Sequence, residues 1–168
     1  MNLRKLILSS LLLTIGLVLH QLVPPILFGM KPDFLLSMMF IAIILGNDFK
    51  LTLIIGIAAG LLTAATTTFP GGQLPNIVDK IITSGLVYLL LKLLKNKLNN
   101  QLRISIIAII GTLVSGFVFL GTAFLLVGLP GPFAALILAV VIPAVIFNLI
   151  GCLALYNASS IALSKITL

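Results

Sequence analysis

The stretch 104–127, ISIIAIIGTLVSGFVFLGTAFLLV, decides the fold class, because it contains no charged residue. Its apolar residues follow one another without the alternation of apolar and polar residues that a membrane β-barrel strand shows over about 10 positions. A run of roughly 20 apolar residues crosses a bilayer as a helix, whose backbone hydrogen bonds are satisfied internally. Residues 6–23 and 51–68 form similar runs. The sequence therefore predicts an all-α integral membrane protein.

The composition of the whole chain agrees with this fold class. Hydrophobic residues make up 61% of the chain and charged residues 8%, and the only acidic residues are Asp33, Asp48 and Asp79. A soluble domain of 168 residues needs more charged side chains than this to cover its surface. The bilayer is therefore the expected solvent.

We count six transmembrane helices and expect them to form a single substrate-binding domain over residues 1–168. The second predicted helix is short, and the sixth contains Pro143, which predicts a kink, a tilt or an extension past the membrane surface. The first run is interpreted as a retained helix, because no small-residue cleavage site follows it. The six predicted spans are 5–23, 33–46, 51–68, 78–95, 104–127 and 132–163.

The placement of the basic residues predicts the orientation in the membrane, and we expect no nucleic-acid partner. With the N-terminus in the cytoplasm, eight of the ten Lys and Arg residues fall on the cytoplasmic side, which follows the positive-inside rule. Both termini are therefore expected in the cytoplasm, in a multi-pass protein of the cell membrane. The cluster 92–103 is interpreted as a topology anchor that touches anionic membrane lipid. The predicted cytoplasmic residues are Arg4, Lys5, Lys50, Lys92, Lys95, Lys97, Arg103 and Lys165.

Three segments rich in Gly, Pro and polar residues interrupt the apolar runs, and this topology places all three on the outer side. They are 25–34, 69–80 and 128–133. Each contains a proline at or near a predicted helix start, where proline is tolerated; these are Pro32, Pro75 and Pro132. Helix N-termini carry free N–H groups and a positive dipole end, which suit a carboxylate.

The charged residues of these segments complete the chemistry that an amino-acid zwitterion needs. Lys31 and Lys80 add positive charge, and Asp33 and Asp79 can receive an ammonium group. Ionisable residues close to a membrane core favour a functional interpretation. An alternative for Asp79 and Lys80 is that both are first-turn residues facing interfacial water.

Other residues of the second outer segment have local interpretations as well. Asn76, followed three residues later by Asp79, also fits an N-cap with an acidic residue in the first turn. Gly71 and Gly72 are expected in a tight turn, and they also let backbone approach a ligand.

Residues that support catalysis are scarce, so we expect no enzyme, no cofactor and no metal. His20, the only histidine, is interpreted either as a hydrogen-bonded interfacial residue or as a ligand contact beside the first outer segment. The single cysteine, Cys152, excludes an internal disulfide and is expected to pack in the core. The chain has no phosphate-binding loop of the form GxxxxGK[ST], so any ATP hydrolysis by that route belongs to a partner.

Small residues at helical spacing predict close helix contacts. Gly56-x-x-x-Gly60 and Gly111-x-x-x-Ser115 are expected to pack within the bundle. Ser10 and Thr14, in the cytoplasmic half of the first helix, have two interpretations, internal packing or a docking stripe for a second membrane subunit.

Three stretches resemble the tryptophan-transporter family, whose members are similar to substrate-binding S components of energy-coupling factor (ECF) transporters. They are Pro24-Pro25 with Gly29-Met30-Lys31-Pro32-Asp33, then TFPGGQLPNIVDK at 68–80, and VGLPGPFAA at 127–135. The resemblance covers nearly the whole chain. It implies an S-component-like bundle of six helices with cytoplasmic termini, a nutrient site near the outer surface, and association with an ECF coupling membrane protein and two ATPase subunits. The stripe that S components use against the coupling protein corresponds to Ser10 and Thr14, which stand where the family pattern has alanines.

The resemblance further implies L-tryptophan as the substrate. The residues expected around it are Lys31 and the helix N-termini for the carboxylate, Asp33 or Asp79 for the ammonium, Gln73 or Asn76 for the indole N–H, and Phe69, Pro70 and Phe133 for an apolar slot. The absence of tryptophan from the chain agrees with this interpretation. Uptake of another aromatic amino acid or an indole compound, and a role as a membrane scaffold or assembly protein, are the alternatives.

Overall fold

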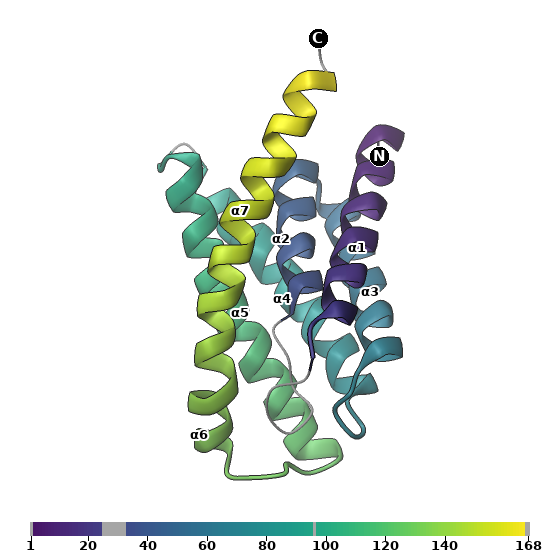
Figure 1. Cartoon of the computed structure of the whole chain (residues 1–168), viewed down its shortest axis with the longest axis vertical. Coiled ribbons are helices and arrows are strands. Elements are labelled where there is room, and N and C mark those ends of the chain that lie inside the picture. The colour runs from purple at the N-terminus through teal and green to yellow at the C-terminus, as the bar shows by residue number, and fades with distance from the viewer. Residues whose placement is uncertain (1, 25–32, 96, 167–168) are drawn as a thin grey trace.

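The computed structural model describes residues 2–24, 33–95 and 97–166, with side chains up to residue 161. All regular secondary structure in these residues is helical, and the helices form a single bundle (Figure 1). In chain order the helices are α1 (Leu3–Leu22), α2 (Phe34–Gly46), α3 (Phe49–Thr66), α4 (Gln73–Leu93), α5 (Asn100–Leu126), α6 (Phe133–Leu136), the π-helix η1 (Ile137–Val141) and α7 (Ile142–Ile166).

The all-helical class is confirmed for the described residues. Five helices are long and apolar enough to cross a membrane, and α2, with 13 residues, is shorter. Two predicted helix starts were too late, since α4 begins at Gln73 instead of 78 and α5 at Asn100 instead of 104. The second outer segment is therefore irregular only up to Gly72, and Pro75 lies in the first turn of α4.

The last membrane helix runs through α6, η1 and α7 and contains the irregularity that Pro143 predicts. Proline has no backbone N–H and its ring displaces the preceding turn, so an α-helical hydrogen bond is lost there. The chain widens into the π-helical turn Ile137–Val141 directly before the proline, and the Ile142 N–H donates to the Ile137 carbonyl. The C-terminal part of α7 extends beyond the neighbouring helices (Figure 1).

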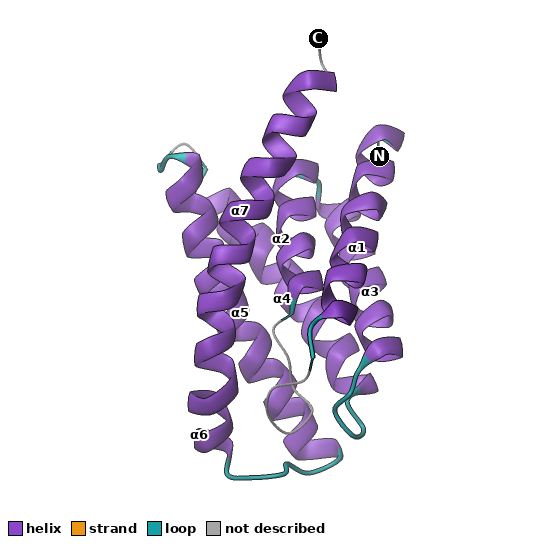
Figure 2. Cartoon of the chain, in the orientation of Figure 1, coloured by secondary structure: helices purple, strands orange, loops and turns teal. Residues whose placement is uncertain are grey.

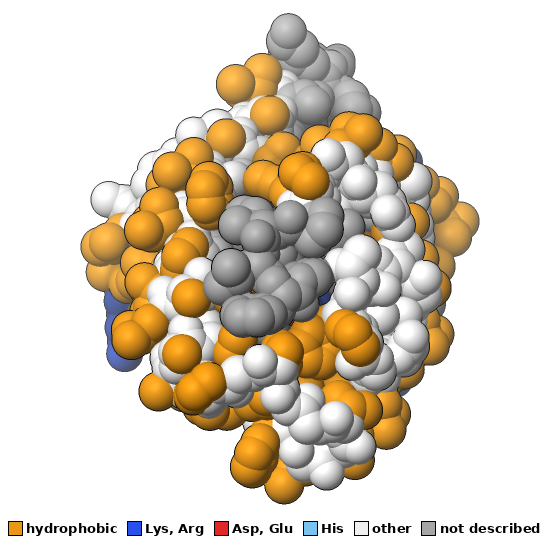
Figure 3. Space-filling model, turned by 60° about the horizontal axis from the view of Figure 1, so that its bottom comes forward, with side chains coloured by type: hydrophobic (Ala, Val, Ile, Leu, Met, Phe, Trp, Pro, Cys, Tyr) orange, Lys and Arg blue, Asp and Glu red, His pale blue; other side chains and the backbone are white. Residues whose placement is uncertain are grey.

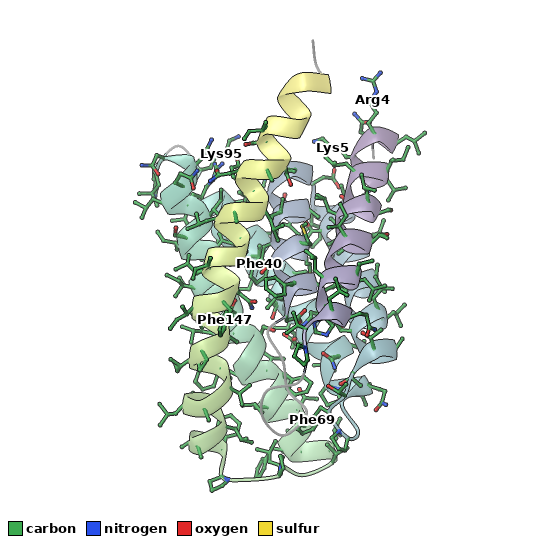
Figure 4. All side chains as sticks on the ribbon, viewed as in Figure 1. Arg4, Lys5, Phe40, Phe69, Lys95 and Phe147 are labelled. Carbon is green, nitrogen blue, oxygen red and sulfur yellow. The ribbon has the colours of Figure 1, made fainter. Side chains whose placement is uncertain are left out.

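The two ends of the chain lie at the same end of the bundle (Figure 1). Arg4, Lys5 and Lys95 are at that end, whereas Phe69 is at the opposite one (Figure 4). The loops after α3 and α5 also lie at the opposite end (Figure 2), whose surface is mostly hydrophobic or uncharged in the atoms that Figure 3 shows. Two of the three segments predicted to share one side are thus together, and the third falls largely within residues 25–32, outside the described residues.

Helix α2 forms the centre of the bundle, and nearly all of its side chains are buried between the other helices. At its C-terminal end the Lys5 Nζ donates to the Gly46 carbonyl over 2.8 Å, and the Lys92 Nζ donates to Asn47 Oδ1 over 3.0 Å. These contacts hold that end at the basic end of the bundle. Because 13 residues of helix rise only about 20 Å, against about 30 Å for the hydrocarbon core, the N-terminal end of α2 stops inside the bundle.

Helices α3 and α4 pack closely through the Gly56-x-x-x-Gly60 motif, as predicted. A Cβ added at Gly56 would lie 2.9 Å from the Ser84 Cβ and 3.2 Å from the Lys80 carbonyl oxygen, and one at Gly60 would lie 3.1 Å from the Ile77 Cα. The second motif is also internal, because a Cβ at Gly111 would meet the Phe40 ring at 2.6 Å.

Replacing Gly56 with alanine is expected to destabilise the bundle by about 1–3 kcal/mol, because the added methyl group has no room between α3 and α4. Thermal unfolding in detergent measures this change. Gly121→Ala is the matched control, since a Cβ at Gly121 meets nothing within 4 Å. An unfolding temperature equally high for the Gly56→Ala and control variants would contradict the packing described here.

Candidate functional site

A cavity opens below the N-terminal end of α2, between α1, α3, α4, α5 and the last membrane helix. Its empty volume, which includes open solvent at the mouth, is about 730 Å³. The lining residues are His20, Asp33, Leu36, Thr63, Thr67, Thr68, Phe69, Asn76, Asp79, Lys80, Thr112, Ser115, Gly116, Phe119, Leu120, Val140, Val141, Ala144 and Asn148.

Lys80 joins two carboxylates in the wall of this cavity. Its Nζ lies 2.7 Å from Asp33 Oδ2 and 2.6 Å from Asp79 Oδ2. Lys80 and Asp79 are 2% and 1% exposed, so both charges are removed from bulk solvent. A buried ammonium group is stable only with such partners. We call these three residues the charged triad.

Asp79 is held by two hydroxyl groups as well as by Lys80. The Thr83 hydroxyl, one turn along α4, donates to Asp79 Oδ1 over 2.9 Å. The Ser115 hydroxyl from α5 donates to Oδ2 over 2.8 Å. Every oxygen of this carboxylate therefore accepts a hydrogen bond, which fixes its position between α4 and α5.

Asp33 belongs to the triad because it is the N-cap of the short helix α2. Its Oδ1 accepts from the Leu36 N–H over 2.9 Å, and the His20 Nδ1 of α1 lies 3.4 Å from the same oxygen. Four helices, α1, α2, α4 and α5, therefore meet at the triad. The three charged residues have one carboxylate more than ammonium groups, so a second ammonium group in the cavity would be electrostatically favoured.

The rest of the wall is apolar and aromatic. Phe69 and Phe119 lie edge to face with 5.3 Å between ring centroids. Leu120 and Val141 are buried beside them. A flat apolar group that enters the cavity therefore meets aromatic and aliphatic side chains, while the charged triad lies on the α2–α4 side.

Several polar residues of the cavity, Thr112 and Asn148 among them, come from apolar runs and were missed in the sequence. Thr112 of α5 and Asn148 of α7 are 3% and 0% exposed, and the Asn148 Nδ2 donates to Thr112 Oγ1 over 3.3 Å. The signal that would have found them is a polar side chain inside an otherwise apolar membrane span, which marks a bundle interior or a functional site.

Six of the twelve residues expected around a ligand line the cavity. They are His20, Asp33, Phe69, Asn76, Asp79 and Lys80. The N-cap interpretation of Asn76 is wrong, because α4 begins at Gln73 with Gly72 as its N-cap. Its Nδ2 instead donates to the Gly72 carbonyl over 2.8 Å. The first-turn interpretation of Asp79 and Lys80 is likewise wrong, because both are buried and are the seventh and eighth residues of α4.

The other expected residues lie away from the cavity lining. Pro70 and Gln73 are exposed at the end of the bundle. Gly71 has a φ of 70°, and the Gly72 N–H donates to the Phe69 carbonyl, so both glycines form the tight turn that was expected. Phe133 packs on Phe117, with 6.2 Å between ring centroids. Lys31 falls outside the described residues.

Ser10 and Thr14 are exposed on α1, so their interpretation as internal packing residues is wrong. Their hydroxyls donate to carbonyls of the same helix, those of Leu6 and Ser10, over 3.0 and 2.9 Å. Cys152 is buried as expected, with its Sγ 3.8 Å from the Ser37 carbonyl oxygen.

These features define a class of protein, a polytopic membrane protein with an internal cavity suited to a small solute. The chain belongs to the tryptophan transporter TrpP family, whose model matches residues 2–164. This is a transporter family and not an enzyme family. Together with the five long apolar helices of this chain, it identifies a multi-pass protein of the plasma membrane.

Three curated relatives are each described as a probable tryptophan transport protein. The one from Clostridium acetobutylicum is 56% identical over 89% of this chain and 88% of its own length. Those from Clostridium perfringens and Bacillus subtilis are 43% and 45% identical, over 99% and 93% of this chain and 97% and 90% of their own lengths. No solved structure matches the chain.

Replacing Lys80 with methionine is expected to destabilise the protein by about 3–5 kcal/mol, because two buried carboxylates lose their shared partner. Thermal unfolding in detergent measures the loss. Lys50→Met is the control, since Lys50 is exposed in the first turn of α3. Adding Asp79→Asn to Lys80→Met is expected to restore part of the stability; an unchanged unfolding temperature in Lys80→Met would refute the role given to the triad.

Proposed function

We propose that this chain is the membrane-embedded substrate-binding subunit for tryptophan uptake, and that the cavity is its tryptophan site. The observation that carries the proposal is the charged triad in an otherwise apolar and aromatic cavity. A free amino acid brings one ammonium group and one carboxylate. The ammonium group pairs with Asp33 or Asp79, and the carboxylate pairs with Lys80.

The indole ring then lies against the apolar side of the cavity. Phe69 and Phe119 offer ring edges and faces, and Leu120, Val140 and Val141 offer aliphatic surface. Aromatic pairs with offset or edge-to-face geometry contribute about 0.5–1.5 kcal/mol beyond burial of their area. The family and the names of the curated relatives support tryptophan over other amino acids as the substrate.

The cavity belongs to the extracellular half of the protein in this proposal. Arg4, Lys5 and Lys95 lie at the end where both termini are found, which fits a cytoplasmic end by the positive-inside rule. Residues 67–69, which line the cavity, follow α3 at the opposite end. Six crossings with cytoplasmic termini bring the cavity close to the outer surface.

Uptake against a gradient needs energy from a partner, which we propose is an ATP-driven ECF module of one coupling membrane protein and two ATPase subunits. The sequence has no GxxxxGK[ST] loop of its own. The exposed side chains of Ser10 and Thr14 leave a small-residue stripe on the outer face of α1, between larger exposed residues such as Ile7 and Leu11. Small residues allow a partner helix to approach closely.

Tryptophan emission tests the binding site directly, because the chain contains no tryptophan. We expect a saturable blue shift when the purified protein is titrated with L-tryptophan. Asp33→Asn should weaken binding at least about tenfold, because it removes the carboxylate charge but keeps a good N-cap residue. Asp48→Asn is the matched control, since Asp48 caps α3 at the other end of the bundle.

The outcomes of this titration separate the alternatives. No shift in a protein that circular dichroism shows to be helical would refute tryptophan binding. Displacement of bound tryptophan by equal amounts of L-phenylalanine, L-tyrosine or indole would identify the broader class of aromatic ligands. Equal weakening by Asp33→Asn and Asp48→Asn would place the effect in helix capping instead of in ligand contact.

A second variant tests the proposed partner. Ser10→Leu with Thr14→Leu is expected to leave tryptophan binding unchanged and to reduce uptake into cells at least about tenfold, because bulky side chains block a close helix contact. Ser105→Leu on α5, a partly exposed serine outside α1, is the control and should transport normally. Normal uptake by the double variant would exclude this stripe as the coupling surface.

A further inference from the structure

Asn148 provides a neutral hydrogen-bond acceptor in the floor of the cavity. It lies on α7, on a different helix from every member of the charged triad, and its exposed fraction is 0%. Its Nδ2 donates to the Thr112 hydroxyl. No donor among the residues that the structure describes reaches its Oδ1. A buried carbonyl oxygen without a donor is destabilising and therefore unusual in a folded protein.

The position of Asn148 relative to the triad follows from its partner. Thr112 lies one turn before Ser115 on α5, and Ser115 bonds Asp79. One turn of three residues is about 4.5 Å along the helix. Since α5 runs towards the cavity end of the bundle, Thr112 and Asn148 lie further inside than Asp79. Gly116, Val141 and Ala144 provide neutral wall around them.

We propose that Asn148 is the residue that determines specificity for the indole N–H of tryptophan, an inference that rests on the proposed function. An amide oxygen in apolar surroundings favours a neutral donor. For an ammonium group, the free energy lost by removing its hydration shell would exceed the free energy gained from one hydrogen bond to the amide. Of the polar groups of tryptophan, only the indole N–H is a neutral donor at a ring edge. The head group binds at the triad, and the edge of the ring that carries the N–H faces Asn148 Oδ1.

The two acceptors expected from the sequence are less well placed. Gln73 is exposed at the end of the bundle and does not line the cavity. Asn76 lines it, but it lies on α4 one turn before Asp79 and is tied to the Gly72 carbonyl through its Nδ2. It stands on the same helix as the charged groups, where it is better placed to meet the head group than the ring.

The experiment compares two ligands that differ at one atom. In 3-benzothienyl-L-alanine a sulfur atom replaces the indole N–H. Competition against the emission of bound L-tryptophan gives the affinity of both. The wild-type protein should prefer tryptophan by about tenfold, the order expected for one buried hydrogen bond. Asn148→Leu, which replaces the amide with an apolar group of similar size, should bind the two ligands within about twofold of each other.

Asn76→Leu is the matched control, since it makes the same substitution in the same cavity and should keep the tenfold preference. Thr112→Val provides a second test if Asn148→Leu does not fold. This substitution keeps the side-chain volume but removes the hydroxyl that orients the Asn148 amide. It should therefore lower the preference for tryptophan over the sulfur analogue. An unchanged preference in Asn148→Leu, or in Thr112→Val when that variant alone folds, overturns the assignment. Loss of the preference in Asn76→Leu would identify Asn76 as the acceptor of the indole N–H, and would also overturn the assignment to Asn148. Absence of tryptophan binding by the wild-type protein would instead refute the proposed function itself, and this inference with it.

Discussion

The shortness of α2 is the constraint on which the rest of the structure depends. Its C-terminal end is held at the basic end of the bundle by Lys5 and Lys92. Its 13 residues then end far short of the opposite surface, and the capping carboxylate of Asp33 is left among the other helices. A carboxylate in that position needs a cationic partner, and Lys80 is that partner. Asp33 and Leu36 at this end of α2 line the cavity.

The glycines of α3 let its backbone lie close to α4 at Lys80. Cβ atoms added at Gly56 and Gly60 would lie 3.2 Å from the Lys80 carbonyl oxygen and 3.5 Å from its Cβ. The Lys80 side chain therefore starts beside the backbone of α3, and its Nζ ends between Asp33 and Asp79. Close helix packing and the charged site meet at the same contact between α3 and α4.

The sequence predicted the parts of this structure that depend on local pattern. Unbroken apolar runs identified the helices, and charged residues beside Gly- and Pro-rich segments drew attention to Asp33, Asp79 and Lys80, which line the cavity. The pairing of Asp33 with Lys80 could not be predicted, because it depends on how deep α2 ends within the fold. The N-cap assignment of Asn76 failed because Pro75 in the first turn is compatible with an earlier helix start. Asn148 was missed because its neighbours in the sequence are all apolar, so its inward orientation was not apparent.

The triad also limits what can make the site selective under the proposed function. Lys80, Asp33 and Asp79 already pair with one another, so a bound zwitterion exchanges these contacts for its own and gains only part of their energy. Every free amino acid carries the same zwitterion. Discrimination between amino acids must therefore come from the neutral part of the cavity, where Phe69 and Phe119 favour a flat ring and Asn148 favours a ring that carries a donor. Under the proposed function, the charges therefore orient the substrate and the neutral wall of the cavity selects it.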